Sequence, residues 1–316
     1  MTVTKKDMEF ASADGKSRVY ACCWLDEEKT PRFILQICHG MCEYIGRYCE
    51  FAEFLCANGG VVFGNDHLGH GKTKALNEPS YFGYFAKKDG EKLIVQDVHT
   101  LTGIAKKEYP DLPFIIMGHS MGSMVARSYM TKYGEEACGA IYMGTSGANN
   151  LTGIIRFLAR VGMIFGRAKK PATLLSHLAF SKYNDRYEDV RSKNDWITRE
   201  RERVEIYDAD PLCTFLFTDR AAYDFANLVD EVSGVQWAEK LPKDKPYLLI
   251  SGEMDPVGNF SEGVREVYDW MRQAQLSDVT MKLYEGARHE LLNEINRDEV
   301  KQDILSWIDA RIGKGA

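Results

Sequence analysis

The chain has 316 residues, 45% of them hydrophobic, and a formal net charge of -6 at pH 7. This length and apolar content can form a substantial core, either as one large domain or as a domain with an insert. The negative charge, together with the lack of a sustained block of Lys or Arg, argues against a nucleic-acid partner. The N-terminus has no apolar signal region and no stretch is long enough to span a bilayer, so we expect a cytoplasmic protein.

The first half of the chain alternates strand-like and helix-like segments, as a doubly wound sheet does. Two early strands flank a turn at Asp14 and Gly15, and one amphipathic helix ends at Gly59. A later helix ends before Pro110. The predicted elements, in chain order, are two strands within residues 10–25, a strand at 33–38, a helix at 47–58, a strand at 61–65, a helix at 91–109, and strands at 113–117 and 139–143.

A Gly-x-Ser-x-Gly motif at residues 118–122 follows the strand at 113–117 and precedes a helix-like run at 123–130. The order of strand, sharp turn and helix is that of a nucleophile elbow, which holds a serine hydroxyl out of the secondary structure. The flanking glycines let strand and helix pack closely, and the amides behind Ser120 point toward a developing oxyanion. We therefore predict that Ser120 is a catalytic nucleophile; the alternative is that it only caps the helix.

The alternation stops in the middle of the chain. Residues 149–232 are helical and irregular in character, and we interpret them as a cap inserted into an α/β core of residues 1–148 and 233–316. The most apolar cap segment, 151–165, carries apolar residues at helical spacing on a stripe wider than one core contact needs. This excess predicts apolar surface that covers an acyl chain; a cap helix buried entirely against the core is the alternative.

Core-type strands resume near the C-terminus, at 247–251 and 279–284, and a helix ends the chain. Asp255 lies in the turn after the first of these strands, and His289 follows the second. With Ser120, they complete the chain order of serine, acid and histidine that a catalytic triad has in this kind of sheet. We predict that His289 is the general base and that Asp255 orients it; the alternatives are an Asp-Pro turn and a helix cap.

At this point the chain resembles the α/β-hydrolase superfamily and, within it, the monoacylglycerol lipase and lysophospholipase group, which is similar to serine aminopeptidase S33. The resemblance covers nearly the whole length. It departs from the family pattern at Tyr44, where relatives often carry a histidine, and at Lys72 and Thr73, where many have a serine. The motifs that carry it are HGMCE at 39–43 with Arg47 and Tyr48, DHLGHG at 66–71, GHSMG at 118–122, DPVG at 255–258, and RHE at 288–290 with Leu292, Asn293 and Glu294.

The resemblance implies an α/β-hydrolase fold with a mostly parallel, doubly wound sheet of about eight strands and an inserted helical cap. It also implies that the backbone N–H groups of Met41 and Met121 hold the oxyanion. Neither a cofactor nor a metal ion is expected. The residues predicted to bind substrate are Gly40, Cys42, Ile155, Leu158, Leu212 and Val257.

Several polar residues near these motifs are expected to have supporting roles. Glu43 and Arg47 should hold the oxyanion loop in place, and His119 should point away from the base. Glu290 should contribute to a helix cap. The eight cysteines contain no Cys-x-x-Cys pair and are expected to be reduced packing residues; Cys42, next to the oxyanion loop, is either near the pocket or a rim thiol without a catalytic role.

Together these features predict a serine carboxylic-ester hydrolase, a carboxylesterase or lipase, that cleaves single-chain acyl esters of the monoacylglycerol or lysophospholipid type through an acyl-enzyme on Ser120. Its partner would be a small-molecule ester, with transient contact between the cap and a membrane or micelle surface. The alternatives are an acyltransferase, a peptidase or a C–C hydrolase with the same triad, and a non-catalytic ligand-binding protein. The sequence leaves the oligomeric state open.

Overall fold

The computed structural model describes residues 3–77 and 80–313. An eight-stranded sheet forms its centre, with strand order β1-β2-β4-β3-β5-β6-β7-β8. The first two strands join antiparallel, β2 also pairs antiparallel with β4, and the remaining neighbours are parallel. This confirms the predicted fold class. The strands are β1 (Val3–Ala11), β2 (Arg18–Asp26), β3 (Phe33–Cys38), β4 (Gly60–Asn65), β5 (Phe114–His119), β6 (Gly139–Met143), β7 (Pro246–Gly252) and β8 (Asp278–Tyr284).

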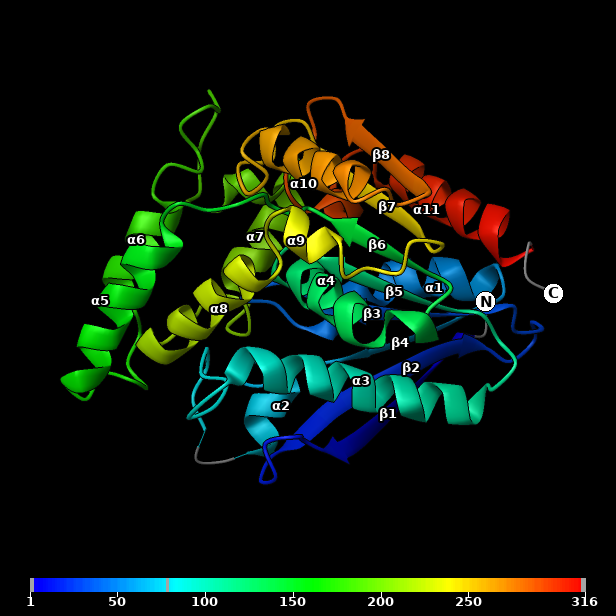
Figure 1. Ribbon diagram of the computed structural model, residues 1–316, viewed down its shortest axis with the longest axis horizontal. Helices are drawn as coiled ribbons and strands as arrows, with labels where there is room; N and C mark the ends of the chain where they lie inside the picture. The colour runs from blue at the N-terminus through cyan, green and yellow to red at the C-terminus, as the bar shows by residue number, and fades with distance from the viewer. Residues whose placement is uncertain (1–2, 78–79, 314–316) are drawn as a thin grey trace.

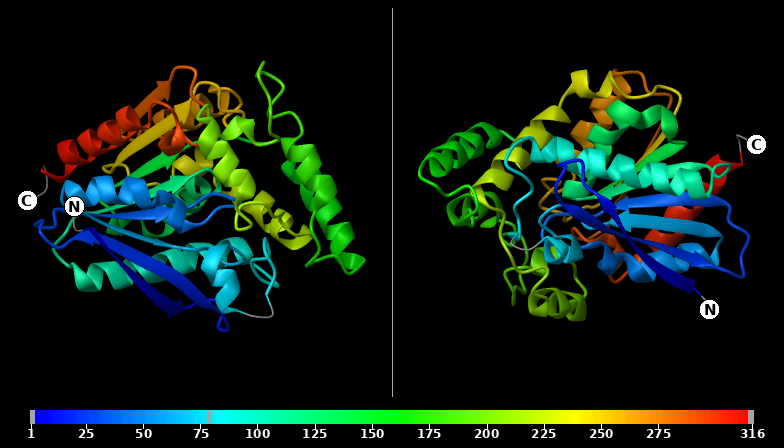
Figure 2. Two further views of the ribbon diagram at one scale, coloured as in Figure 1. Left: turned by 180° about the vertical axis from the view of Figure 1, so that it is seen from behind. Right: turned by 90° about the horizontal axis from the view of Figure 1, so that it is seen from below.

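Helices cover both faces of the sheet (Figures 1 and 2). In the described residues, the α-helices are α1 (Cys49–Ala57), α2 (Gly71–Leu76), α3 (Gly90–Glu108), α4 (Met121–Tyr133), α5 (Thr152–Ile164), α6 (Thr173–Phe180), α7 (Arg201–Ala209), α8 (Asp219–Glu231), α9 (Val235–Ala238), α10 (Glu262–Gln273) and α11 (Arg297–Ile312). Short 3-10 turns stand at Ile45–Tyr48, Gly134–Glu136, Asp195–Ile197 and Leu291–Asn293.

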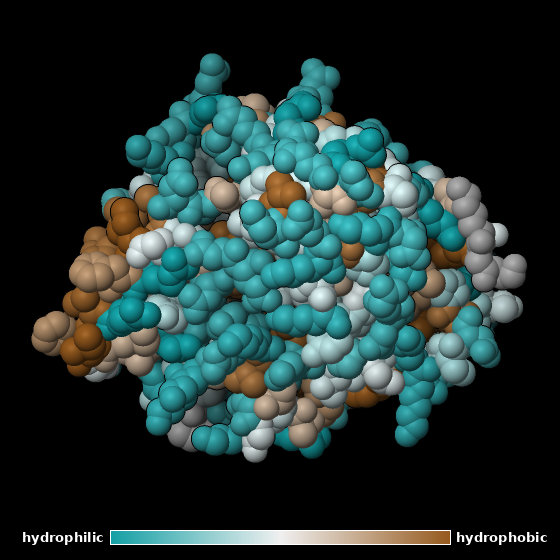
Figure 3. All heavy atoms as spheres, viewed as in Figure 1, coloured by the Kyte–Doolittle hydropathy of each residue, from teal (hydrophilic) through white to brown (hydrophobic). Residues whose placement is uncertain are grey.

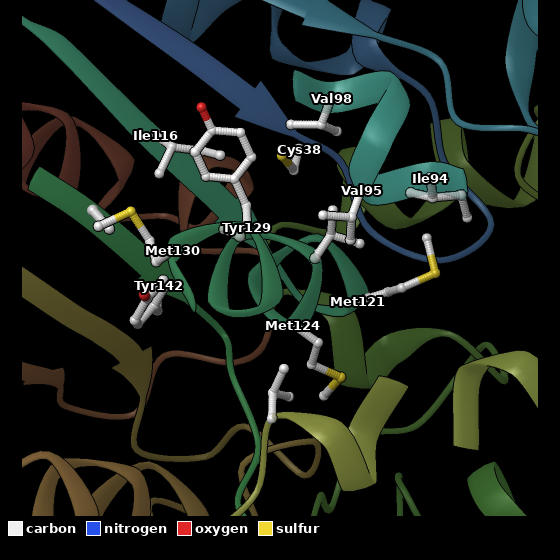
Figure 4. Packing of buried hydrophobic residues seen from close by; sticks show 14 of the residues in the cluster. Cys38, Ile94, Val95, Val98, Ile116, Met121, Met124, Tyr129, Met130 and Tyr142 are labelled. Carbon is white, nitrogen blue, oxygen red and sulfur yellow. The ribbon is translucent and has the colours of Figure 1, made fainter. Parts of the chain in front are cut away.

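The two faces of the sheet carry separate hydrophobic cores because successive strand residues point to opposite sides. On β3, Ile34 belongs to the core beneath α3, α4 and α10, and Leu35 belongs to the core beneath α1 and α11. Figure 4 shows how Met121 and Tyr129 of α4 lie among residues of the first core. Helix α4 is thus buried along most of its length, which fixes the position of the residue just before it.

Most strand predictions agree with the structure within one or two residues, but the N-terminal prediction was wrong. Strand β1 begins at Val3, whereas the apolar pattern predicted strand only from residue 10. The missed part carries exposed charges, including Lys5, Lys6 and Asp7, and it pairs only with β2 at the edge of the sheet. An edge strand needs no alternating apolar pattern, and charges there also oppose pairing with another chain.

The chain between β6 and β7 contains the helices α5 to α9. Helices α5 and α6 project from one end of the sheet, opposite the end where both termini lie (Figure 1). They have a small apolar cluster of their own, formed by Ala159, Ala172 and Leu175, and α5 packs on α8. Helix α8 in turn contacts α3 and α4 of the core. The division at residues 148 and 233 remains a prediction.

Candidate active site

Ser120 stands between the end of β5 and the start of α4 in a strained backbone conformation, with φ 54° and ψ -123°. A positive φ is rare for a residue other than glycine, and such strain persists only where the surrounding structure imposes it. Here the serine N–H donates to Met143 O on β6 at 2.9 Å, and its carbonyl accepts from the N–H of Ser123 at 2.9 Å. The side chain remains partly exposed. The predicted elbow is therefore present.

The glycines on either side of the elbow make this turn sterically feasible. A Cβ added to Gly118 would lie 2.0 Å from Gly122 O, and one added to Gly122 would lie 2.0 Å from Cys38 O. Both contacts are with backbone atoms, so no side-chain movement could relieve them. The close approach of β3, β5 and α4 thus depends on the absence of these two side chains.

We expect Gly122→Ala to destabilise the protein by about 3 kcal/mol or more, because the added methyl group must push α4 away from β3. Esterase activity should fall with it, since the same shift moves Ser120. Chemical denaturation of the variant measures the free energy of unfolding. Gly153→Ala on α5 is the matched control, because a Cβ at Gly153 meets no atom within 4 Å. Equal stability of the two variants would contradict this account.

Asp255 and His289 come together at the same edge of the sheet, after β7 and β8. His289 Nδ1 lies 2.9 Å from Asp255 Oδ2, which also accepts from the Ser251 hydroxyl at 3.1 Å. The other carboxylate oxygen accepts from the Val257 N–H at 2.8 Å. Both side chains are buried. A carboxylate with these donors holds one imidazole tautomer, the one that carries its proton on Nδ1.

The ring of His289 is enclosed by two further rings. Trp196 lies on one side with 5.1 Å between centroids, and His119 lies at 4.6 Å. The expectation that His119 points away from the base was wrong: its Nε2 is 3.3 Å from the carbonyl oxygen of His289. Within the described residues, the Ser120 hydroxyl and His289 do not share a hydrogen bond, and such bonds are often long before substrate binds.

Glu43 connects the loop after β3 to the neighbour of Ser120. Its Oε1 accepts from the Gly40 N–H at 2.5 Å, the Tyr48 hydroxyl at 2.9 Å and His119 Nδ1 at 3.0 Å. Its Oε2 lies 3.0 Å from Arg47. The expected role of this pair in holding the loop is confirmed. Because Gly40 precedes Met41, the carboxylate fixes the backbone segment that contains a predicted oxyanion donor.

Arg47 extends this cluster to the residue after the catalytic histidine candidate. Its guanidinium forms two parallel bonds to Glu290, at 2.6 and 2.7 Å. The prediction that Glu290 caps a helix was wrong, since this carboxylate pairs with Arg47 and with the Asn293 amide instead. Bidentate geometry of this kind gives orientation as well as energy. The loop after β3 and the loop after β8 are thereby tied together.

The charges in this cluster favour one another's ionised forms. Burial alone raises the pKa of Glu43, but the hydrogen bond from His119 and the charges of His119 and Arg47 hold that pKa well below its usual range. Burial alone lowers the pKa of His119, but the hydrogen bond and charge of Glu43 raise it above the usual value. With Glu290, the cluster therefore sets two carboxylates against the Arg47 guanidinium and the His119 ring, so each buried carboxylate has a partner.

We expect Glu43→Gln to lower kcat/KM about 100-fold, because a loop that loses its anchor displaces an oxyanion donor. The free energy of unfolding should fall by about 3 kcal/mol, because His119 and Arg47 lose a buried partner. Because the pKa of Glu43 is lowered in the folded state, its carboxylate makes its full contribution to the free energy of unfolding above about pH 4.3. That contribution disappears as the pH falls toward the pKa of Glu43 in the folded protein. Urea titrations should therefore show a smaller difference in free energy of unfolding between wild type and Glu43→Gln at pH 3 than at pH 7.

Glu53→Gln on α1 is the control for that experiment, since Glu53 is exposed and, among the described residues, accepts a hydrogen bond from the Cys49 thiol alone. An unchanged kcat/KM in Glu43→Gln would contradict the role assigned to the cluster. An effect on KM alone would contradict it as well, because a displaced oxyanion donor acts on the transition state.

The residues predicted to bind substrate are found in separate parts of the structure. Gly40 lies beside Ser120, and a Cβ added to it would be 3.1 Å from the Ser120 Cβ. Val257 contacts Asp255 through its backbone. Ile155 and Leu158 pack within the small cluster between α5, α6 and α8, and the N–H of Leu212 donates to Asp210. No hydrogen bond among the described residues joins these last three to Ser120, and their role stays a prediction.

The loop that begins at Gly40 also contacts helix α7. Cys42 has a positive φ of 56°; its thiol donates to Phe215 O at 3.2 Å, and its carbonyl accepts from the Tyr207 hydroxyl. Burial raises the pKa of this thiol. Tyr44, one of the departures from the family pattern, donates to Asp210 at 2.8 Å. All eight cysteines are free.

Trp196, Ser251 and the contact between His119 and His289 were not predicted from the sequence. A serine four residues before Asp255 could have suggested a hydrogen bond to it, because the two flank one turn. Trp196 gave no such signal, since it lies 93 residues from His289, in the short 3-10 turn Asp195–Ile197. Within the described residues, no group of His, Cys, Asp or Glu could hold a metal ion, and no helix is both long and apolar enough to cross a membrane.

A mostly parallel sheet with a serine elbow after β5, a buried acid after β7 and a histidine after β8 defines an α/β hydrolase. The sequence pattern of the family described as serine aminopeptidase, S33, matches residues 29–296. The chain therefore belongs to this family, and it is a serine hydrolase of the ester-cleaving kind.

Known proteins resemble this chain over nearly its whole length. A monoacylglycerol lipase from Mycolicibacterium smegmatis is 28% identical over 96% of this chain and 97% of its own. The human monoglyceride lipase is 27% identical over 95% of this chain and 89% of its own. A thermostable carboxyl esterase from Bacillus coagulans, solved in complex with glycerol, superposes with a TM-score of 0.91 at 33% identity and covers 98% of this chain and 100% of its own.

Proposed function

We propose that the protein hydrolyses single-chain acyl esters of the monoacylglycerol type through an acyl-enzyme on Ser120. The observation that carries this proposal is the buried, hydrogen-bonded pair of His289 and Asp255 at the sheet edge where Ser120 stands in its strained elbow. A lone serine hydroxyl is too weak a nucleophile for ester cleavage, and a base with an orienting carboxylate removes that limitation.

In the proposed mechanism, the Ser120 hydroxyl attacks the ester carbonyl while His289 Nε2 accepts its proton. Asp255 keeps the other ring nitrogen protonated and stabilises the imidazolium that forms. The histidine then gives its proton to the departing alcohol, which leaves an acyl group on the serine oxygen. A water molecule, deprotonated by the same histidine, attacks this acyl-enzyme. The bond to the serine oxygen then breaks, the histidine returns its proton to that oxygen, and the carboxylic acid is released.

We assign stabilisation of the negative charge that develops on the carbonyl oxygen to the backbone N–H groups of Met41 and Met121. Met121 is the first residue of α4, so its N–H has no acceptor within the helix. The positive end of the helix dipole supports an anion at the same place. Met41 follows Gly40, which Glu43 anchors. Loss of one donor of this kind typically raises the barrier by roughly 3 to 4 kcal/mol.

The assignment of a single-chain substrate rests on the relatives and on the apolar composition of the cap. Two relatives that match almost the full chain are named for monoacylglycerol or monoglyceride, and the similar esterase was solved with glycerol. To test it, hydrolysis of p-nitrophenyl esters from acetate to palmitate should be measured beside 1-monoacylglycerol and lysophosphatidylcholine. An optimum at medium or long chains, with monoacylglycerol cleaved, is the expected result; activity on acetate alone would overturn the assignment.

Product analysis in the same assay separates hydrolysis from transfer. With added glycerol as a competing acceptor, a hydrolase releases mainly the free acid, whereas an acyltransferase accumulates the glycerol ester. We expect the free acid. The predicted cytoplasmic location and the oligomeric state have no bearing on this result.

We also propose that α5 and α6 touch a lipid surface transiently. Ile164 and Phe165 are 77% and 79% exposed, and Phe157 on the same helix is 66% exposed. Figure 3 shows a hydrophobic area at the projecting end of the molecule, where α5 and α6 lie in Figure 1. Exposed apolar patches of this kind mark interaction sites, and nearby Lys169 and Lys170 could approach anionic headgroups.

We expect sedimentation with phosphatidylcholine vesicles to decrease several-fold in the double variant Ile164→Ser with Phe165→Ser, because each change removes apolar area that enters the interface. Ile206→Ser is the control, since Ile206 is 55% exposed but lies on α7. Equal sedimentation of wild type and the double variant would contradict this contact.

A further inference from the structure

An open cavity of about 110 Å³ lies apart from Ser120, between the chain leading into α7 and the loop that carries His289. Pockets for drug-sized ligands are roughly 300 Å³ or larger, so this cavity fits a small group rather than a large ligand. Its lining comes from two parts of the chain that are far apart in sequence. The lining residues are Asp189, Arg191, Asp195, Thr198, Arg199, Arg201, Val204 and Arg288.

Four arginine side chains line the cavity, and two of them are held in place by a shared carboxylate. Arg191 and Arg201 share the carboxylate of Asp189. The Asp195 carboxylate accepts hydrogen bonds from the backbone N–H groups of Arg191 and Ser192, so it is bonded within its own turn and, among the described residues, not to an arginine side chain. These contacts hold two arginines at the wall of the cavity without neutralising both of them.

The other two arginines reach the cavity from positions supported by buried groups. Arg199 pairs with Glu294, which is fully buried, at 2.9 Å. Arg288 donates to the carbonyls of Asp195 and Thr198 at 2.5 and 3.4 Å and stacks over the ring of Tyr187. Within the described residues no carboxylate pairs with the Arg288 side chain. Around the cavity, in the part of the chain that the structure describes, there are four arginines and, when Glu294 is counted with Asp189 and Asp195, three carboxylates, which leaves an excess of one positive charge.

Helix α7 adds a favourable dipole to this surplus. Arg201 is its first residue and Val204 lies in its first turn, and both line the cavity. The N-terminal end of a helix carries partial positive charge and N–H groups without helical acceptors. Several guanidinium groups with planar, paired donors beside such an end match the oxygens of a phosphate group better than those of a neutral ligand.

We propose that this cavity binds a phosphate group, either as free phosphate or as a phosphomonoester. It is a separate site from the ester-cleaving one, although the two share neighbours. Asp195 lines the cavity while Trp196 packs on His289, and Arg288 lines it while His289 bonds Asp255. A bound phosphate would therefore join the chain segment before α7 to the loop that carries the catalytic histidine candidate.

The test is isothermal titration calorimetry of the 316-residue chain with inorganic phosphate and, separately, with glycerol 3-phosphate, at constant ionic strength set by sodium chloride. Saturable binding with one site per chain is expected. Arg191→Gln should weaken it about tenfold, because a charge-assisted bond is lost. Arg191 is largely exposed, so this variant should fold. Arg288→Gln should have a larger effect, because Arg288 has no carboxylate partner to satisfy.

Arg203→Gln is the matched control, because Arg203 is on α7, as Arg201 is, but pairs with Glu50 outside the cavity. The phosphate-binding curve of this variant should equal that of the wild type. Tighter binding of glycerol 3-phosphate than of phosphate would identify an esterified group as the ligand, and the reverse order would identify the free anion. Absence of saturable binding, or equal binding in all three variants, would overturn the proposal. Ser120→Ala should bind phosphate like the wild type, which separates this result from the fate of the proposed esterase activity.

Discussion

Replacing Ser120 by alanine should reduce kcat for p-nitrophenyl ester hydrolysis by a factor on the order of 10⁶, the scale seen when the nucleophile of a serine triad is removed. The loss is large because the oxygen that forms the acyl-enzyme is gone, and the hydroxyl of nearby Ser123 is buried and donates to the Ser120 carbonyl. The strained backbone at residue 120 is set by contacts of the peptide groups with Met143 and Ser123, so the variant should still fold.

Ser306→Ala on α11 provides the control, since Ser306 is exposed and its hydroxyl is hydrogen-bonded, within the part of the chain that is described, to the Gln302 amide alone. It should keep wild-type kcat. Thermal unfolding of Ser120→Ala within a few degrees of wild type would show that the loss is chemical. Turnover by Ser120→Ala within about tenfold of wild type would rule out the acyl-enzyme mechanism, because residual catalysis from the remaining groups is far smaller than that.

Replacing Asp255 by asparagine should lower kcat about 10⁴-fold with little change in KM. Asp255 Oδ2 accepts from His289 Nδ1, and an asparagine could present its NH₂ group there instead. The imidazole would then carry its proton on Nε2, where it cannot accept the serine proton. Because the two side chains have nearly the same shape, packing around the site should be preserved, and the effect should appear in kcat.

A pH profile distinguishes this cause from a local rearrangement. If the tautomer is wrong, activity of Asp255→Asn should rise at alkaline pH, where hydroxide can act in place of the base, while the free energy of unfolding stays close to wild type. Asp269→Asn on α10 is the control, since Asp269 is exposed and outside the site. A variant with near-normal kcat at pH 7 would show that Asp255 does not orient the base.

Residues with a local signature could be predicted from the sequence. Ser120 lies in a five-residue motif whose glycines are required by contacts of 2.0 Å, so the turn is encoded within a few residues. Asp255 and His289 each follow a strand that is recognisable from its apolar run. Parallel strands bring their carboxyl ends to one edge of the sheet, so chain order alone was enough to place these groups near one another.

The cap was the least predictable region because its helices do not follow one pattern of burial. Segment 151–165 has the predicted apolar surface on Phe157 and Ile164, while Ile155 and Leu158 pack between α5, α6 and α8; its covering of substrate stays a prediction. The prediction that this apolar stripe is wider than one core contact needs agrees with the exposed apolar side chains on α5. The sequence could not predict which part of the stripe is buried, because that depends on the position of α8, which is set by its contacts with α3 and α4.

The amino-acid sequence by itself determined where most strands lie along the chain, the elbow and the three residues of the predicted triad, because backbone sterics and apolar periodicity act over short stretches of chain. Tertiary structure decided what surrounds them. Arg47 meets Glu290 across 243 residues, and His119 meets the carbonyl of His289 across 170. Such partners are selected by the need to satisfy buried charges once the sheet has formed, and no local pattern records which residues will satisfy them.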